Sequence, residues 1–293
     1  MAEHLTVRTP QLEVEVRTYG GAGGMPVLLL HGWPDGPAGW DVIAGKLAGA
    51  GFRVAVPALR GFEATRFLES STPRRGRLVE LADDLLALAD ALEWPRFLLA
   101  GHDWGARTAY RVALLAPRRV SRMATLSAPW APTVAEPIVS VRQARMYWYQ
   151  WLFNTPMGPR LLAADRHEFV AHIWREWSPT WRPGPGEIES ALRASDNPDW
   201  IAVTLDYYRN RWDWGAGDEA DVEASATRIP VPTLMIHGTA DGCVAPPAVE
   251  GMAERFPAGL ETCLLDDVGH FPHREAPDAV ARALLRWFGS PQR

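Results

Sequence analysis

The segment Gly101–Gly105 reads Gly-His-Asp-Trp-Gly and places a carboxylate between two flanking glycines. It follows the apolar run Arg96–Ala100, which predicts a short buried strand, and leads into Ala106–Leu115, which predicts a helix. A strand, a tight turn and a helix are the context of a nucleophile elbow, whose central residue is usually serine. Here Asp103 occupies the central position, so the sequence predicts a carboxylate nucleophile.

The exchange of serine for aspartate changes the reaction that such an elbow can perform. A carboxylate that attacks an ester or an amide would form an anhydride and gain little. A carboxylate that attacks a saturated carbon forms an ordinary alkyl ester, which water can cleave in a second step. The sequence therefore indicates an alkyl electrophile, either an epoxide or an alkyl halide, as the substrate.

Two polar segments later in the chain supply the other members of a possible triad. Asp241 follows the predicted strand Val231–Ile236, and His270 follows the predicted strand Leu260–Leu265. In a triad the acid orients the histidine, and the histidine acts as the base. The order Asp103, Asp241, His270 matches the order nucleophile, acid, histidine.

A third polar turn lies near the start of the chain. His31–Pro34 follows the predicted strand Val27–Leu30 and reads His-Gly-Trp-Pro. A backbone N–H of this turn can form one half of an oxyanion hole, and the N–H after the nucleophile can form the other half. We therefore predict that Trp33 and Trp104 supply the two donors.

These segments need a scaffold that brings strand ends together. Strands and helices alternate in the first part of the chain and again near its end, which predicts a mostly parallel sheet flanked by helices. Between them the strand signals disappear, and helical patterns occupy 138–153 and 187–212. We expect a core domain over 1–130 and 228–293, with a helical cap over 131–227 that covers the carboxyl ends of the strands.

Composition argues against several other classes of protein. The net charge of −5 gives no reason to expect nucleic acid or an anionic membrane as partner, and we interpret the basic cluster Pro73–Arg77 as a solvated surface. No apolar run reaches membrane-spanning length, and the first residues do not resemble a signal peptide. Cys243 and Cys263 form no disulfide framework or metal signature. We expect a cytoplasmic monomer or homodimer without metal or cofactor.

Over nearly its whole length the chain resembles α/β-hydrolases of the epoxide hydrolase family, which are close to the haloalkane dehalogenases. The resembling segments are the HGxP-type turn His31–Pro34, the LRG-type segment Leu59–Phe62, the elbow Gly101–Ala106 and the histidine loop Val268–Phe271. The resemblance implies the α/β-hydrolase fold with an inserted helical cap and no cofactor. One departure is Phe62–Arg66, where the family usually continues toward a Gly-x-Ser turn.

The resemblance also implies two ring-opening residues in the cap. In the epoxide hydrolase family two cap tyrosines donate hydrogen bonds to the epoxide oxygen. Tyr149 and Tyr208 lie in motifs that resemble the corresponding ones, with Tyr147 and Tyr207 as neighbouring alternatives. Phenols remain protonated at neutral pH and suit this role.

We predict a hydrolase that opens a small-molecule epoxide to a vicinal diol, with water as the second reactant. The epoxide would form an alkyl ester on Asp103, and water activated by His270 and Asp241 would cleave it. The alternatives are a haloalkane or haloacid dehalogenase, for which Arg107 could bind a substrate carboxylate, and a non-catalytic ligand-binding protein. The expected pocket residues are His31, Pro34, Trp148, Trp151 and Phe271.

Overall fold

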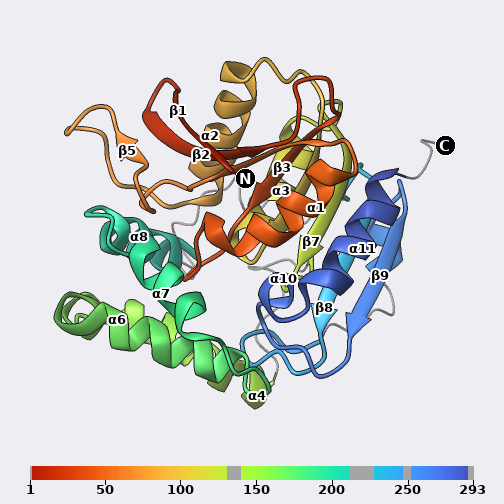
Figure 1. The fold of residues 1–293 in the computed structure, drawn as a ribbon. Helices are drawn as coiled ribbons and strands as arrows, with labels where there is room; N and C mark the ends of the chain where they lie inside the picture. The colour runs from red at the N-terminus through yellow and green to blue at the C-terminus, as the bar shows by residue number, and fades with distance from the viewer. Residues whose placement is uncertain (1, 131–139, 212–227, 247–251, 290–293) are drawn as a thin grey trace.

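The structure is a computed structural model that describes residues 2–130, 140–211, 228–246 and 252–289. A nine-stranded sheet runs through its centre in the order β1-β2-β4-β3-β6-β7-β8-β9, with β5 paired to β2 (Figure 1). The strands are β1 (Glu3–Arg8), β2 (Leu12–Tyr19), β3 (Pro26–Leu30), β4 (Arg53–Pro57), β5 (Arg66–Phe67), β6 (Phe97–His102), β7 (Val120–Leu126), β8 (Thr233–Gly238) and β9 (Leu260–Leu265).

The six strands from β4 to β9 along this order are parallel, whereas β1, β2 and β5 pair antiparallel at one edge. Parallel strands require crossover connections, and helices form most of them here. Because the carboxyl ends of the parallel strands share one edge, the turns after β3, β6, β8 and β9 lie near each other. This arrangement confirms the predicted α/β class, a mostly parallel sheet flanked by helices.

The central strands are buried on both faces, so their side chains alternate between two cores. In β3, Leu28 and Leu30 face one core, while Val27 and Leu29 face the other. A parallel sheet covered on both sides reads as a continuous apolar run, as β3 does in the sequence. The fixed backbone of these strands is what holds the polar turns at their ends in place.

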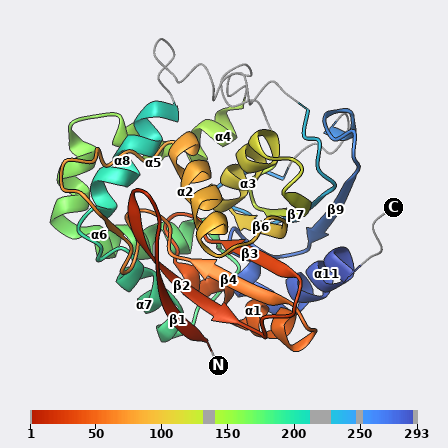
Figure 2. The same cartoon turned by 90° about the horizontal axis from the view of Figure 1, so that it is seen from above.

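Helices cover both faces of the sheet (Figure 2). The core of one face contains side chains of α1 and α11, and that of the other contains side chains of α2 and α3. The helices are α1 (Asp41–Gly49), α2 (Leu78–Ala91), α3 (Trp104–Leu115), α4 (Val141–Met146), α5 (Trp148–Phe153), α6 (Met157–Trp177), α7 (Pro185–Ala194), α8 (Trp200–Arg211), α10 (Pro272–Glu275) and α11 (Pro277–Gly289), with short 3₁₀ turns η1 (Pro37–Trp40) and η2 (Met252–Arg255).

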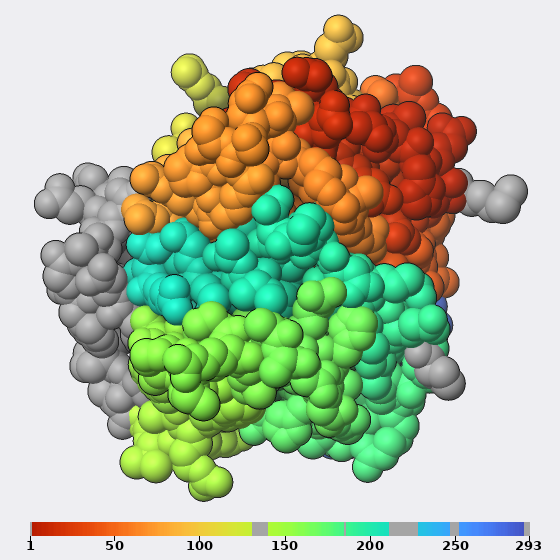
Figure 3. Space-filling view, turned by 90° about the vertical axis from the view of Figure 1, so that its left-hand side faces the viewer, coloured from red at the N-terminus to blue at the C-terminus, as the bar shows by residue number. Residues whose placement is uncertain are grey.

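Helices α4 to α8, here called the inserted helices, follow β7 and precede β8 in the chain. They lie together beyond one end of the sheet, and in Figure 3 they form a continuous green to teal block. The expected helical patterns at 138–153 and 187–212 fall largely on α4, α5, α7 and α8, but they omit α6, the longest helix. Residues 131–139 and 212–227, on which the expected domain boundaries fall, lie outside the described residues.

The basic cluster at Pro73–Arg77 is not simply a solvated surface, so that expectation was wrong. Arg74 pairs with Asp199 at 2.9 Å, and the Gly76 backbone N–H donates to the Asp206 carboxylate at 2.8 Å. The cluster therefore binds α8, and Figure 3 shows the orange segment in contact with the teal one. No helix among the described residues is both long and apolar enough to cross a membrane.

Candidate active site

Asp103 lies at the sharp turn between β6 and α3. Its backbone has φ 48° and ψ −111°, a conformation that is strained for a residue with a side chain. The Arg107 N–H donates to the Asp103 carbonyl at 3.0 Å, which begins the helix directly after the turn. This backbone conformation places the Asp103 carboxylate at the carboxyl end of the sheet and keeps it from lying along helix α3.

The flanking glycines permit this turn because two backbone segments approach closely. A Cβ atom on Gly101 would lie 2.2 Å from the Gly105 carbonyl oxygen, and a Cβ on Gly105 would lie 2.4 Å from that of Leu30. No side chain fits in either place. The spacing Gly-x-Asp-x-Gly thus follows from how tightly the elbow packs on itself and on β3.

The Asp103 carboxylate is contacted from two sides. The backbone N–H of Trp33, in the turn after β3, donates to Asp103 Oδ2 at 3.1 Å. On the other side, His270 Nε2 lies 3.8 Å from Asp103 Oδ1. The structure thus places the predicted donor of the first turn and the predicted base of the last turn beside the predicted nucleophile.

A carboxylate holds the imidazole of His270 from behind. His270 Nδ1 lies 2.9 Å from Asp241 Oδ2, and Asp241 Oδ1 accepts the backbone N–H groups of Cys243 and Val244 at 2.7 and 2.8 Å. With its proton on Nδ1, the ring presents a bare Nε2 toward Asp103. Burial disfavours the imidazolium, but the Asp241 carboxylate outweighs it, so the pKa of His270 is raised.

Two buried phenols approach this group from the inserted helices. Tyr149 comes from α5 and Tyr208 from α8, and their ring centroids are 5.3 Å apart. The Tyr149 hydroxyl accepts from Gln150 Nε2 at 2.7 Å, and the Tyr208 hydroxyl accepts from Trp104 Nε1 at 3.2 Å. Burial raises the pKa of both phenols, and the nearby Asp103 carboxylate raises it further. Both therefore stay protonated at neutral pH and can donate.

The neighbouring tyrosines occupy different surroundings. Tyr207 stacks on Trp104 with a centroid distance of 4.0 Å and an interplanar angle of 22°, whereas Tyr147 precedes α5 and is buried. Tyr207 thus acts as part of the wall around the elbow. Tyr149 and Tyr208 are the two phenols that share an aromatic contact with each other and with Trp33.

The side chain of Trp33 is the centre of an aromatic cluster. Its indole is fully buried, and its Nε1 donates to Thr204 Oγ1 of α8 at 3.1 Å. The ring lies nearly parallel to Tyr149, with an interplanar angle of 10°. The rings within 6.5 Å of it are Trp104, Tyr149, Phe153, Phe169, Trp177, Trp200 and Tyr208. These rings form one buried aromatic cluster that joins the turn after β3 to α5, α6 and α8.

The five residues expected to line the pocket fall in two groups. Phe271 and Pro34 are buried and contact Trp174, through its ring and its indole N–H respectively. His31 is also buried, but its ring nitrogens are engaged by the Gly32 carbonyl and the Leu59 N–H. The indole N–H groups of Trp148 and Trp151 bind Glu176 and the Ala144 carbonyl, and the Trp151 side chain reaches the surface.

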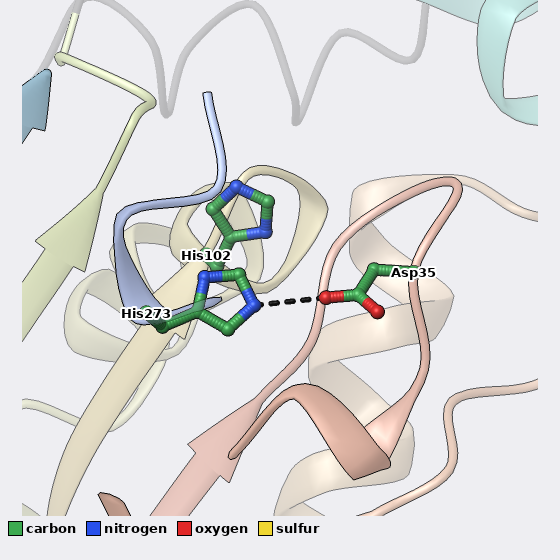
Figure 4. A group of neighbouring side chains, drawn as sticks. All are labelled: Asp35, His102 and His273. Atoms are coloured by element: carbon green, nitrogen blue, oxygen red, sulfur yellow. Dashed lines mark hydrogen bonds and ion pairs between the residues drawn. The ribbon is translucent and has the colours of Figure 1, made fainter. Parts of the chain in front are cut away.

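One buried polar cluster beside the elbow joins residues that no sequence motif relates. The ligand atoms of Asp35, His102 and His273 lie within 4.8 Å of one another (Figure 4). The Asp35 carboxylate already accepts from His273 Nε2 at 2.8 Å and from the Arg274 guanidinium at 2.6 Å. A cation would compete with a guanidinium already in place, so this group does not fit a metal.

The same cluster joins three segments of the chain. Burial alone would raise the pKa of Asp35, but Arg274 and His273 keep that pKa well below its ordinary value. Asp35 is therefore ionised and forms an ion pair with Arg274. Arg274 also binds Glu187 of α7, and His102 Nε2 donates to the His270 carbonyl at 2.8 Å. The partners are distant in the sequence, so no spacing predicts the cluster. The only indication in the sequence is that His102 precedes Asp103 and that His273 and Arg274 follow His270.

Comparison with known proteins identifies the class to which this molecule belongs. Residues 25–277 match the family described as the alpha/beta hydrolase fold, so the chain belongs to that family. Its similar relatives carry a narrower name. Epoxide hydrolase A of Mycobacterium tuberculosis is 28% identical over 319 residues, which cover 96% of this chain and 95% of that protein. An epoxide hydrolase of Caballeronia sordidicola is 27% identical over 299 residues, which cover 90% of this chain and 87% of that protein.

Solved structures give the same result. The structure of a candidate epoxide hydrolase from Klebsiella pneumoniae has a TM-score of 0.92 and 35% sequence identity, and the match covers 98% of both chains. A candidate epoxide hydrolase from Pseudomonas aeruginosa has a TM-score of 0.84 and 25% identity, with 98% of this chain and 95% of that chain covered. The fold is therefore shared with proteins named epoxide hydrolases.

Proposed function

We propose that this α/β-hydrolase opens small-molecule epoxides to vicinal diols. The observation that carries the proposal is the setting of Asp103. Its carboxylate lies between the Trp33 N–H and His270 Nε2, and the Tyr149 and Tyr208 phenols face the same space. A nucleophile, a base and two acids suited to an epoxide oxygen are thus present together.

In the first half-reaction an oxygen of Asp103 attacks an epoxide carbon. The bond between that carbon and the ring oxygen breaks, and the oxygen takes a proton from Tyr149 or Tyr208. The product is a hydroxyalkyl ester on Asp103. The phenols suit this step because their raised pKa values keep them protonated until negative charge develops on the oxygen.

In the second half-reaction His270 Nε2 removes a proton from water, and the water oxygen attacks the carbonyl carbon of the ester. The Trp33 and Trp104 backbone N–H groups stabilise the tetrahedral oxyanion. Collapse of this intermediate restores the Asp103 carboxylate and releases the diol. The two protons of the water return to the departing oxygen and to the tyrosinate, so the reaction needs no other reactant.

The inserted helices supply both phenols, so we propose that they form a functional cap. In this division the core domain comprises residues 1–130 and 228–293, and the cap comprises residues 131–227. The carboxylate and the imidazole come from core turns, whereas the ring-opening acids come from α5 and α8. Substrate would bind between the two parts.

A second candidate, a dehalogenase for a carboxylated alkyl halide, is favoured by one observation. Arg107 lies one turn after Asp103 on α3 and is half-buried, and no carboxylate in the described part of the chain pairs with it. A guanidinium in that position could bind a substrate carboxylate. Halide release from haloacids would support this candidate.

The cap tyrosines separate the two functions. Tyr149→Phe and Tyr208→Phe each remove one hydroxyl and keep the ring, so packing changes little. We expect each variant to lose about a hundredfold in the rate of epoxide opening, because a donor to developing negative charge is removed. The rate is measured by single-turnover formation of the Asp103 ester with styrene oxide and an aliphatic epoxide.

Tyr110→Phe is the matched control, because Tyr110 is a buried tyrosine of α3 whose hydroxyl bonds the Thr125 hydroxyl of β7 at 2.8 Å. It should open epoxides at the parent rate. If Tyr149→Phe and Tyr208→Phe also react at the parent rate, the two phenols are packing residues and the epoxide mechanism is wrong. Release of halide without diol formation by the parent protein would favour the dehalogenase.

A further inference from the structure

The loop that carries His270 is bound by the end of α6, an inserted helix far from it in sequence. The His270 backbone N–H lies 3.1 Å from two acceptors, the Trp177 carbonyl oxygen and Ser178 Oγ. The fixed Nδ1 contact with Asp241 sets how the imidazole is rotated. The contacts to α6 instead set where the backbone beneath that imidazole lies.

The Glu275 carboxylate holds the same loop from the other side. Its Oε2 accepts the Gly269 N–H at 2.7 Å, and its Oε1 accepts the Phe271 N–H at 2.9 Å. Oε1 also accepts the Ser178 hydroxyl at 2.6 Å. One carboxylate thus binds the backbone on both sides of His270 and orients the hydroxyl that receives the His270 N–H.

The end of α6 also contacts the loop that carries Asp241. The Trp177 carbonyl accepts the Gly242 N–H at 2.9 Å as well as the His270 N–H. The approach is close on both loops: a Cβ on Gly242 would lie 2.2 Å from the Glu176 carbonyl, and a Cβ on Gly269 would lie 2.5 Å from Ser178 Oγ. The backbone at the end of α6 therefore fixes the loop that carries Asp241 relative to the loop that carries His270.

We propose that Glu275 and Ser178 are positioning residues that place His270 for attack of water on the Asp103 ester. This inference rests on the proposed function for its chemistry. Neither residue contacts Asp103, and His270 acts only in the second half-reaction. Loss of either residue should therefore slow cleavage of the ester and leave its formation unchanged. A displacement of the His270 imidazole by a fraction of an ångström is enough to slow cleavage of the ester, because proton transfer from water depends steeply on geometry.

Two substitutions, Glu275→Gln and Ser178→Ala, each remove part of the hydrogen bonding that holds the His270 loop. In Glu275→Gln an amide NH₂ must face either the Gly269 N–H or the pair formed by Ser178 and Phe271, so one donor loses its acceptor. Ser178→Ala removes the hydroxyl. Thr180→Val is the control, because Thr180 Oγ1 bonds the Asp267 carbonyl at 2.7 Å on the same segment but contacts neither His270 nor Glu275.

The experiment follows the ester by intact-protein mass after one turnover of styrene oxide. We expect Glu275→Gln and Ser178→Ala to accumulate the ester and to cleave it about tenfold to a hundredfold more slowly than the parent. Ester formation should keep its parent rate, and Thr180→Val should behave as the parent in both steps. Parent-like cleavage in Glu275→Gln, or equal loss in both steps, would overturn the proposal.

A second measurement does not depend on the reaction. Several groups set the titration of His270: Asp103, Asp241, His102, His237, His273 and Glu275. Removing the Glu275 charge should lower the pKa of His270, measured by NMR of ring-labelled histidine with His270→Gln as the assignment control. An unchanged pKa in Glu275→Gln would contradict the proposed contact. Absence of ester and diol in the parent, with a shifted pKa in Glu275→Gln, would instead reject the proposed function alone.

Discussion

Asp103 has an unfavourable backbone conformation, and its carboxylate faces the site. A positive φ at a residue with a side chain costs on the order of 1–3 kcal/mol, and the packing of Gly101 and Gly105 maintains it. The turn keeps the carboxylate away from a capping position, and no capping hydrogen bond from Asp103 is present. The local strain is therefore consistent with a chemical role for Asp103.

His270→Gln tests the division of labour between nucleophile and base. The nucleophile needs no base to attack an epoxide, because a carboxylate oxygen forms the bond to carbon without giving up a proton. We expect the variant to form the ester on Asp103 and then to stall, so its mass should rise by the mass of the epoxide. A variant that binds the epoxide but keeps its unmodified mass would contradict this assignment.

The sequence predicted those residues that stand at strand ends within recognisable spacings, namely Asp103, Asp241, His270 and Trp33, and the structure brings them together. It did not predict the Asp35–Arg274 ion pair or the Ser178–Glu275 contact. Each of these pairs joins residues 97 or more positions apart, with no spacing that a motif could reveal. Such pairings are decided by tertiary packing alone.

At the scale of elements, the position of Tyr208 depends on how α8 rests on the core. Gly76 permits the close approach of α8 to the core, because a Cβ at that position would lie 2.2 Å from the Val203 carbonyl oxygen of α8. The salt bridge between Arg74 and Asp199 and the Gly76 N–H to Asp206 hold the two segments together. A small displacement of α8 would move its phenol relative to Asp103.

Gly76→Ala should therefore impair both stability and catalysis. The added methyl group must push α8 outward or bend the loop, which costs about 1–3 kcal/mol of folding free energy. We expect slower formation of the Asp103 ester, together with a lower midpoint of urea unfolding. Gly45→Ala is the control: a Cβ there meets nothing within 4 Å in the middle of α1, so the variant should be as stable as the parent or more stable. Parent-like ester formation in Gly76→Ala would show that α8 tolerates displacement.

The elements of the sheet were predictable because alternating strands and helices carry strong periodic signals. Helix α6 was not predicted, although it is the longest helix. Its backbone departs from helical geometry at Asp165, with φ −156° and ψ 69°, so the apolar spacing before this residue does not continue in phase after it. A kink of this kind interrupts the period on which recognition of a helix depends.

At the scale of the whole molecule, buried histidines surround the carboxyl ends of the strands. Burial lowers the pKa of His31 to about 4, and it also lowers the pKa values of His102, His237 and His273. These rings fold in the neutral form, whereas the unfolded chain would protonate them near pH 6.5. His270 is the exception, since its pKa is raised.

The sign of the resulting pH dependence follows from linkage. Below about pH 6.5 the unfolded chain binds more protons than the folded chain at the four histidines with lowered pKa values, so the free energy of unfolding falls as the pH falls. For His31 alone the loss between pH 6.5 and its folded pKa of about 4 amounts to about 3 kcal/mol. His270 acts in the opposite direction: its contribution is fully present below its unfolded pKa and is lost as the pH rises through its folded pKa. Among the histidines four groups oppose one, so the histidines together should lower the free energy of unfolding from pH 7 to pH 5.

His31→Gln isolates one of these protons. The glutamine Oε1 can accept the Leu59 N–H in place of His31 Nε2, but it does not titrate. We expect the parent to lose free energy of unfolding in urea between pH 7 and pH 5, and we expect the variant to lose about 1.4 kcal/mol less per pH unit once the unfolded histidine is protonated. The variant should also be less stable than the parent at pH 7, because the bond from the His31 ring to the Gly32 carbonyl is lost. Equal slopes in the two proteins would show that His31 is protonated in the folded state, and the acid sensitivity would then have to come from other groups.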